Sequence, residues 1–190
     1  MEKLTLSTKE HDGTWFGVLI SNQSGLVACS FSSSRKSLEK HLRPGARGTV
    51  SNELTDESGI ALNEMINIYH GRKTTNNVRL DWEAVSEFEK SVCKIMKEIP
   101  KGQVTSYGMI AKRLSSGPRA VGTAVARNPW PLFVPCHRVV PADLEIGNYS
   151  IGGTLSEHGC EVKRDLLERE GVPIESDRIA LKAVWVPTGA

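Results

Sequence analysis

A cysteine and a histidine stand side by side in the apolar run LFVPCHRVV, residues 132–140. A free thiol is only a few per cent thiolate at neutral pH, so a nucleophilic cysteine needs a neighbour that removes its proton. Cys136 has His137 beside it, but adjacent side chains of an extended segment point to opposite faces, so their contact requires a turn or a bridging water. Thiol chemistry and an inert core position therefore both stay open, and spacing alone identifies no third group to orient the histidine.

Charge is unevenly distributed around this pair. The net charge is only +2, yet residues 101–140 contain six basic side chains and no acidic one, whereas residues 141–190 contain five basic and nine acidic side chains. An acid-free basic segment suits the phosphate backbone of a nucleic acid. A solvated basic face explains the same charge equally well.

Length and composition bound the class of protein. The chain has 190 residues with 39% hydrophobic side chains, enough for one domain or two small ones with a core. No apolar run approaches the roughly 20 residues of a membrane-spanning helix, and the start lacks the apolar stretch of a secretory signal. We therefore expect a cytoplasmic protein, associated with the nucleoid if the organism is prokaryotic. The four cysteines are scattered without a CxxC pair, which favours reduced thiols.

Residues 1–78 are predicted to form a small α/β domain with a supporting role. Runs rich in β-forming residues at 15–20 and 25–31 predict two antiparallel strands, and helices are expected at 35–43, after Ser34, and at 55–69. The polar residues 72–79 are the expected linker. The histidines and cysteine of this half lack metal-ligand spacing, so no metal site is predicted from them: His11, Cys29, His41 and His70.

Residues 79–190 are predicted to form a mainly helical domain, which makes the fold class α+β. Asp81 is placed to cap a helix that runs to about residue 99, where Pro100 ends it. Helices at 106–114 and 118–127, joined across the turn at 115–117, predict a helix-turn-helix. The second of them is rich in small residues, which suits either close packing on another helix or close approach to a nucleic acid.

Five segments of this second half form a recognisable series of motifs: IPKGQVTSYGMIA (99–111), PRAVGTAVARNP (118–129), VPCHRVV (134–140), GNYSIGG (147–153) and KRDLLEREG (163–171). In sequence and order they resemble the O6-alkylguanine-DNA alkyltransferases, also called methylated-DNA–protein-cysteine methyltransferases. The resemblance extends over about residues 82–171. The first half resembles that family only in its length and its strand-then-helix pattern.

The resemblance implies DNA repair and gives each catalytic role to a residue. It implies that Cys136 takes the alkyl group from O6 of guanine, irreversibly and once per molecule. It implies that His137 is a water-mediated base for this thiol and that Glu170 orients the histidine. It also implies that Tyr107 crowds the target phosphate and assists at guanine N3, and that Asn128 braces the turn before the active-site segment.

The resemblance also implies how DNA is bound. The O6 alkyl carbon lies within the stacked duplex, so the base must be flipped out, and Arg119 corresponds to the finger that enters the stack at that point. Small residues would let the second helix enter the minor groove. The implied DNA-binding residues are Arg119, Tyr107, Ala120, Gly122, Thr123 and Arg127, and the implied substrate pocket is formed by Val139, Tyr149, Ser150 and Pro131.

The partner implied is double-stranded DNA containing O6-alkylguanine, bound by a monomer without membrane, metal or organic cofactor; cooperative binding along DNA is left open. Two alternatives remain. A non-catalytic alkylated-base-binding protein of the same architecture would lack the cysteine that stands at position 136. A Cys-His-Glu thiol hydrolase would leave Arg119 and the acid-free segment unexplained.

Three features depart from the family pattern or lack a role in it. Residues 154–162 are longer than expected, and Ile151 replaces a residue that is commonly small, so both are expected to narrow or reshape the pocket. The tail 174–190 has no assigned role, and its apolar residues are expected to pack on the domain.

Overall fold

The chain folds into two compact units, Met1–Val85 and Ser86–Ala190. The computed structural model describes residues 2–42, 49–75, 77–151, 154–155 and 158–188, and it confirms the predicted α+β class. The division falls later than the predicted boundary after residue 78. The reason is that Leu26 binds the following segment on both sides: its N–H donates to Arg79 O (2.8 Å) and its carbonyl accepts from Asp81 N (2.9 Å).

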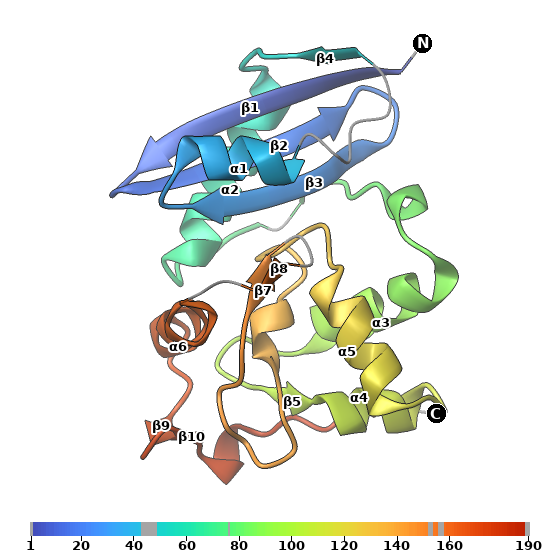
Figure 1. The fold of residues 1–190 in the computed structure, drawn as a ribbon, viewed down its shortest axis with the longest axis vertical. Helices are drawn as coiled ribbons and strands as arrows, with labels where there is room; N and C mark the ends of the chain where they lie inside the picture. The colour runs from blue at the N-terminus through green and yellow to red at the C-terminus, as the bar shows by residue number, and fades with distance from the viewer. Residues whose placement is uncertain (1, 43–48, 76, 152–153, 156–157, 189–190) are drawn as a thin grey trace. The chain divides into compact units, whose positions relative to one another are not determined.

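The first unit is built on a four-stranded sheet in the order β3-β2-β1-β4 (Figure 1). Its strands are β1 (Lys3–His11), β2 (Thr14–Ser21), β3 (Gly25–Ser32) and β4 (Thr49–Ser51). The predicted strands at 15–20 and 25–31 are confirmed and antiparallel. The prediction missed β1, whose sequence KLTLSTKEH is mostly polar, and β4, which pairs with β1 in parallel at the edge.

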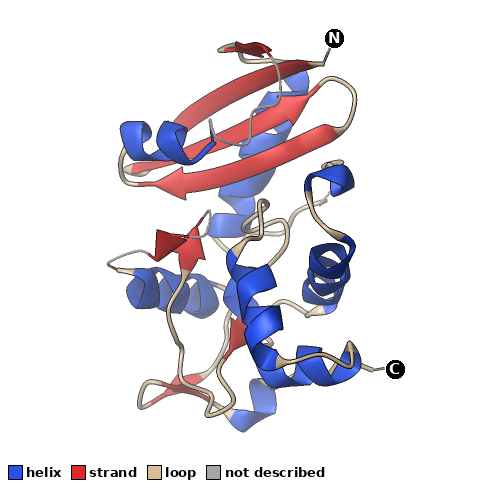
Figure 2. Ribbon diagram, turned by 45° about the vertical axis from the view of Figure 1, so that its right-hand side comes forward, coloured by secondary structure: helices blue, strands red, loops and turns tan. Residues whose placement is uncertain are grey.

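The two predicted helices are confirmed as α1 (Arg35–Leu42) and α2 (Asp56–Tyr69), and they cover the two faces of this sheet (Figure 2). A Cβ on Gly17 of β2 would lie 2.7 Å from the Leu42 side chain, so the glycine lets α1 approach the strand. On the opposite face, the ring of Phe16 lies 5.1 Å from that of Tyr69 in α2. Burial on both faces accounts for the nearly continuous apolar sequence of β2.

The second unit begins with α3 (Glu87–Glu98), which starts later than predicted. Asp81 caps only the short 3-10 helix η2 (Trp82–Ala84), by accepting a hydrogen bond from Glu83 N at 3.2 Å. Ser86 then caps α3 reciprocally with Glu89. The prediction of one helix from Asp81 was wrong because two capping sites lie five residues apart and the stronger capping box starts the longer helix.

The predicted helix-turn-helix is confirmed as α4 (Tyr107–Arg113) and α5 (Pro118–Ala126). Ser106 caps α4 by accepting a hydrogen bond from Met109 N (3.2 Å), and Pro118 opens α5. Between them Ser115 takes a left-handed conformation with φ 49°, which turns the chain sharply. None of the helices that the structure describes has the length and apolar character needed to cross a membrane.

Short elements complete the second unit. They are β5 (Thr105–Ser106), the 3-10 helix η3 (Cys136–Arg138), β6 (Val139–Val140), β7 (Ser150–Ile151), β8 (Thr154–Leu155), α6 (Gly159–Arg169), β9 (Ile174–Glu175), β10 (Arg178–Ile179) and the 3-10 helix η4 (Leu181–Ala183). Pairing of β5 with β6 in parallel joins the start of α4 to the segment that carries Cys136.

The C-terminal tail packs on the second unit, as expected, but not with all of its apolar side chains, because Leu181 and Val186 are exposed. Val104 N donates to Ala183 O (2.9 Å), and Trp185 N donates to Val104 O (2.7 Å). Ile179 and Ala183 are buried in one core cluster with Val104. The expected effect of the segment 154–162 on the pocket depends on residues 156–157 and on side chains at 151–155, which lie outside the described residues.

The start of α6 packs against backbone near the active site, which gives a test of the fold. A Cβ on Gly159 would lie 2.4 Å from Tyr149 O and 3.0 Å from Tyr149 N, so Gly159→Ala is expected to lower the free energy of unfolding by about 1 to 3 kcal/mol. Gly59, inside α2, faces open space, and Gly59→Ala should raise it by roughly 0.5 to 1 kcal/mol. Urea unfolding followed by circular dichroism measures both, and an unchanged Gly159→Ala would contradict this packing.

Candidate active site

Cys136 lies on a short 3-10 turn rather than on an extended strand. Its side chain is buried, and its N–H donates to Val134 O at 2.8 Å. Its thiol Sγ lies 3.5 Å from Tyr149 Oη. On a turn, the neighbouring His137 is not forced to the opposite face, so the geometric objection drawn from extended backbone does not apply.

A chain of charged hydrogen bonds stands beside the thiol. His137 Nε2 lies 2.9 Å from Glu170 Oε1, and the guanidinium of Arg138 donates to both oxygens of the same carboxylate at 2.7 Å. A third donation, from Arg138 Nη1, goes to Ile99 O (2.7 Å) at the end of α3. His137 and Glu170 are both buried. This bidentate arrangement satisfies a buried carboxylate almost completely.

The hydrogen bonds define which nitrogen of His137 carries the proton. Burial by itself would raise the pKa of Glu170, but the hydrogen bonds and charges of His137 and Arg138 outweigh it and lower that pKa to about 2. An ionised carboxylate only accepts, so His137 Nε2 is the donor. Burial lowers the pKa of His137, against the opposing effect of Glu170, and keeps the ring neutral. Its Nδ1 is then the acceptor, and it is buried without a hydrogen-bond partner among the described residues.

Burial also raises the pKa of the Cys136 thiol above its ordinary value. Hydrogen bonds with Tyr149 and Asn128 and the positive charge of Lys163 act in the opposite direction and favour the thiolate. Lys163 is itself buried, donates from Nζ to Val139 O at 2.8 Å, and has its pKa lowered to about 8 by burial. The site therefore holds a neutral thiol surrounded by groups that would stabilise its anion.

A small cavity of about 30 Å³ opens at the thiol. Tyr107 contributes a phenol whose pKa is raised to about 12, first by burial and then by the charge of Cys136, so its hydroxyl stays protonated. Of the predicted pocket residues, Tyr149 and Ser150 line this cavity, whereas Pro131 and Val139 are buried outside its lining. The complete lining is Tyr107, Gly122, Val125, Ala126, Cys136, Asn148, Tyr149, Ser150 and Lys163.

Asn128 spans the turn that leads from α5 to Cys136. Its Nδ2 donates to Val134 O at 2.8 Å, and its Oδ1 accepts from Trp130 N at 3.0 Å. Within this turn the buried Leu132 has φ 76°, a left-handed conformation that costs a side-chain-bearing residue about 1 to 2 kcal/mol. The two side-chain hydrogen bonds help to hold that conformation and so fix where the cysteine emerges.

One face of α5 is exposed, and between its arginines it carries only small side chains. Arg119, Ala120, Thr123 and Arg127 are exposed at helical spacing, whereas the opposite face is buried through residues such as Val121. Gly122 is half-buried, and a Cβ there would lie 4.0 Å from the Tyr107 ring, so it faces α4 across the helix-turn-helix. The structure thus gathers most of the predicted DNA-binding residues on one helix surface.

The basic character of residues 101–140 is smaller in the folded protein than in the sequence. Glu98 pairs with Arg113, Glu89 lies 3.7 Å from Arg127, and Glu170 pairs with Arg138, so acids from outside the segment pair with at least three of its six cations. Arg119 has no ion pair in the part of the chain that the structure describes. The net charge of residues 101–140 therefore overestimates the positive charge of this surface, because the fold places carboxylates from other parts of the chain beside its arginines.

Two functional side chains escaped the sequence reasoning. Arg138 and Lys163 both lie in motifs shared with the family, but the sequence predicted no role for either. For Lys163 a signal existed, since it precedes Glu170 by two helical turns and so shares its side of α6. For Arg138 no local signal existed, because its partner is 32 residues away in the chain.

Comparison with known proteins gives the same result as the geometry. The family model of the DNA-binding domain of 6-O-methylguanine DNA methyltransferase matches residues 87–172. A methylated-DNA–protein-cysteine methyltransferase of Thermococcus kodakarensis is 37% identical over 166 residues, 83% of this chain and 89% of that protein. One from Methanocaldococcus jannaschii is 49% identical over 86 residues, which are 45% of this chain and 47% of that protein.

Solved structures extend the likeness to most of the chain. The crystal structure of O6-methylguanine-DNA methyltransferase from Pyrococcus kodakaraensis matches with a TM-score of 0.69 at 33% identity, over 89% of this chain and 99% of that one. Mycobacterium tuberculosis OGT in complex with DNA matches with a TM-score of 0.68 at 27% identity, over 87% of this chain and 92% of that one.

Fold, site and relatives agree on one class of protein, a DNA-repair methyltransferase whose acceptor is a protein cysteine. The chain belongs to the methylated-DNA–protein-cysteine methyltransferase family. The family predicted from the five sequence motifs is thereby confirmed.

The Glu170 carboxylate predicts a specific dependence of stability on pH. Its pKa is about 2 in the folded protein against an ordinary 4.5, so it stabilises the fold above pH 4.5 and this contribution is lost as pH falls toward 2. The loss amounts to about 3 kcal/mol. Glu170→Gln should be less stable than wild type at neutral pH by roughly 3 to 5 kcal/mol, because the largely buried guanidinium of Arg138 loses its carboxylate partner.

Urea unfolding at a series of pH values measures this effect. The difference between wild type and Glu170→Gln should shrink between pH 4.5 and 2. Glu168→Gln, an exposed neighbour in α6, is the matched control and should follow the wild-type curve. A wild-type to Glu170→Gln difference that stays constant across this window would show that the carboxylate is not held ionised.

Proposed function

We propose that Cys136 is the residue that accepts the alkyl group from O6-alkylguanine in double-stranded DNA, irreversibly and once per molecule. The observation that carries this proposal is the orientation of His137. Glu170, itself held by Arg138, accepts the Nε2–H of His137. The buried Nδ1 is then left as a base without a hydrogen-bond partner among the described residues, on the residue next to the thiol.

The first step is removal of the thiol proton. His137 Nδ1 takes it through a bridging water, and the resulting imidazolium is stabilised by the Glu170 carboxylate. The thiolate left on Cys136 is stabilised by Tyr149, Asn128 and the Lys163 ammonium. Because burial raises the pKa of the free thiol, ionisation is coupled to these neighbours rather than spontaneous.

The second step is displacement at carbon. The Cys136 sulfur forms a bond to the alkyl carbon while the bond from that carbon to guanine O6 breaks, and the electron pair stays on the guanine. Tyr107, whose hydroxyl keeps its proton, donates toward guanine N3 and so reduces the cost of the leaving negative charge. The product is a thioether, and no residue of the site provides a route for its hydrolysis, so each molecule reacts once.

Access to the base requires flipping, because the alkyl carbon is stacked inside the duplex. The low-bulk face of α5 suits close approach to the minor groove, and Arg119 stands on it free of ion pairs within the described chain. Arg119 fills the stack where the base has left. Unstacking costs a few kcal/mol, and less for a lesion that pairs badly, so lesions are selected before the chemistry begins.

The protein works as a monomer in the cytoplasm, where it meets chromosomal DNA. The support for a monomer is that every residue given a role in transfer comes from the unit Ser86–Ala190 of one chain. The alternative of a non-catalytic lesion-binding protein does not explain why the buried thiol of Cys136 lies next to a histidine oriented as a base. A thiol hydrolase leaves the exposed small-residue face of α5 unexplained.

Intact-mass analysis tests the transfer directly. After mixing with duplex DNA that contains O6-methylguanine, the protein is expected to gain one methyl group per molecule, located on the peptide that carries Cys136. Cys136→Ala should bind the same DNA and gain nothing, and Cys160→Ala, which removes an exposed cysteine, should react like wild type. Tight lesion binding without a mass change would leave the binding-protein alternative, and repeated turnover of an ester would favour a hydrolase.

Arg119→Ala tests the flipping step. Loss of the side chain is expected to weaken both lesion binding and single-turnover transfer by about 1 to 3 kcal/mol, roughly 5- to 150-fold. Lys94→Ala removes the same charge from an exposed position of α3 and should leave both nearly unchanged. Fluorescence anisotropy and rapid-quench kinetics give the two values, and wild-type repair by Arg119→Ala would refute the role.

A further inference from the structure

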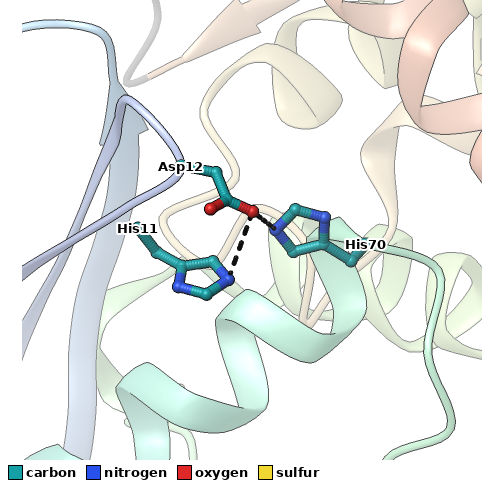
Figure 3. A group of neighbouring side chains, drawn as sticks. All are labelled: His11, Asp12 and His70. Atoms are coloured by element: carbon teal, nitrogen blue, oxygen red, sulfur yellow. Dashed lines mark ion pairs between the residues drawn. The ribbon is translucent and has the colours of Figure 1, made fainter.

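Three side chains of the first unit meet at one end of its sheet, and none of them has a role in the proposed reaction (Figure 3). They are His11 at the end of β1, Asp12 in the following turn and His70 directly after α2. Each offers one ligand atom, and these atoms all lie within 4.8 Å of one another. We propose that they form a binding site for a divalent transition-metal ion of the zinc class.

The fold brings the two histidines together although they are far apart in the sequence. Alternation along β1 places His11 on the same face as Ser7 and Lys9. Ser7 Oγ lies 2.8 Å from Ser58 Oγ near the start of α2, and Lys9 Nζ donates to Asn63 Oδ1 (2.9 Å) one turn further along. The helix therefore runs alongside the strand, and His70, which follows its last residue, lies beside His11 with ring centroids 5.2 Å apart.

The hairpin turn supplies the third ligand. Asp12 and Gly13 have φ 49° and 76°, the left-handed pair of a two-residue type I′ turn between β1 and β2. Glu10 Oε1 accepts a hydrogen bond from Gly13 N at 2.7 Å and so holds the turn from within. This conformation sets the Asp12 carboxylate between the two rings, as the dashed lines of Figure 3 show.

The distances suit an ion better than direct hydrogen bonds. Asp12 Oδ2 lies 3.5 Å from His11 Nε2 and 3.8 Å from His70 Nε2, beyond a good hydrogen bond to either ring. Ligand atoms about 2.0 to 2.1 Å from a tetrahedral zinc ion stand roughly 3.3 to 3.4 Å apart, so small side-chain movements complete the geometry. His11 Nε2 is also buried and has no hydrogen-bond partner within the described residues.

The donor set selects the kind of ion. Two imidazoles and one carboxylate favour zinc and its transition-metal neighbours over magnesium or calcium, which prefer oxygen alone. The Asp12 side chain is 70% exposed, so the fourth position opens to solvent and a water molecule would fill it. The bound ion would tie the β1–β2 hairpin to the end of α2 and stabilise Met1–Val85 by mass action.

Zinc titration of the full-length, metal-stripped protein by calorimetry tests the proposal. One ion per chain is expected, together with a rise in melting temperature. His11→Gln and His70→Gln should each weaken binding by more than the roughly 10- to 100-fold that loss of an outer-shell partner causes. Asp12→Asn keeps a residue that tolerates the left-handed turn and should weaken it as well. The control His41→Gln, a histidine of α1 outside the cluster, should bind like wild type.

Cobalt separates this site from the thiols of the chain. Bound Co²⁺ should give the visible spectrum of nitrogen and oxygen ligation without thiolate-to-metal charge transfer, and zinc should shift the imidazole NMR signals of His11 and His70. A charge-transfer band, or zinc affinity unchanged in both histidine variants while circular dichroism shows them folded, would overturn the proposal. Methyl transfer by Cys136 is measured separately on the same samples, so failure of one proposal is distinguishable from failure of the other.

Discussion

The carboxylate of Glu170 is the point on which the active-site architecture depends. It accepts from His137 and from two nitrogens of Arg138, while Arg138 also reaches the carbonyl of Ile99. One buried acid thereby joins the end of α6, the 3-10 turn of the cysteine and the end of α3. A buried ion pair adds to stability only when its remaining donors and acceptors are satisfied, and this one is satisfied on almost every side. The same bonds that hold the elements together orient the histidine.

Burial of Cys136, the proposed nucleophile, disfavours its thiolate, and the surrounding residues offset this effect. Enclosure of Cys136 in the protein raises the pKa of its thiol and so disfavours the thiolate that the proposed reaction needs. Asn128 and Lys163 offset that cost from two directions, since each favours the thiolate. Each also has a structural partner: Asn128 bonds the turn around Leu132, and Lys163 bonds Val139 O. Stability and reactivity are therefore coupled at this site through shared side chains.

Much of the fold and of the reactive centre could be predicted from local sequence. Two strands, both helices of the first unit and the helix-turn-helix follow from periodicity and capping residues, and those signals are local. The start of α3 was misplaced because Asp81 and Ser86 both cap, and the sequence does not show which cap leads the longer helix. The strand β1 was missed because its sequence is mostly polar; on the face toward α2, Ser7 pairs with Ser58 instead of packing apolar side chains.

The sequence by itself determined the family, because its five motifs occur in the family's order, and the same motifs contain Cys136, the proposed acceptor, and its neighbours. Only the tertiary structure decided which charges are paired, which nitrogen of His137 is available and which groups meet across long separations. Arg138 with Glu170, and His11 with His70, are pairs formed by packing of distant elements. Spacing along the chain predicts a contact only within one helix or hairpin. Contacts between elements depend on how their buried surfaces pack, and this packing is determined by the complete tertiary structure.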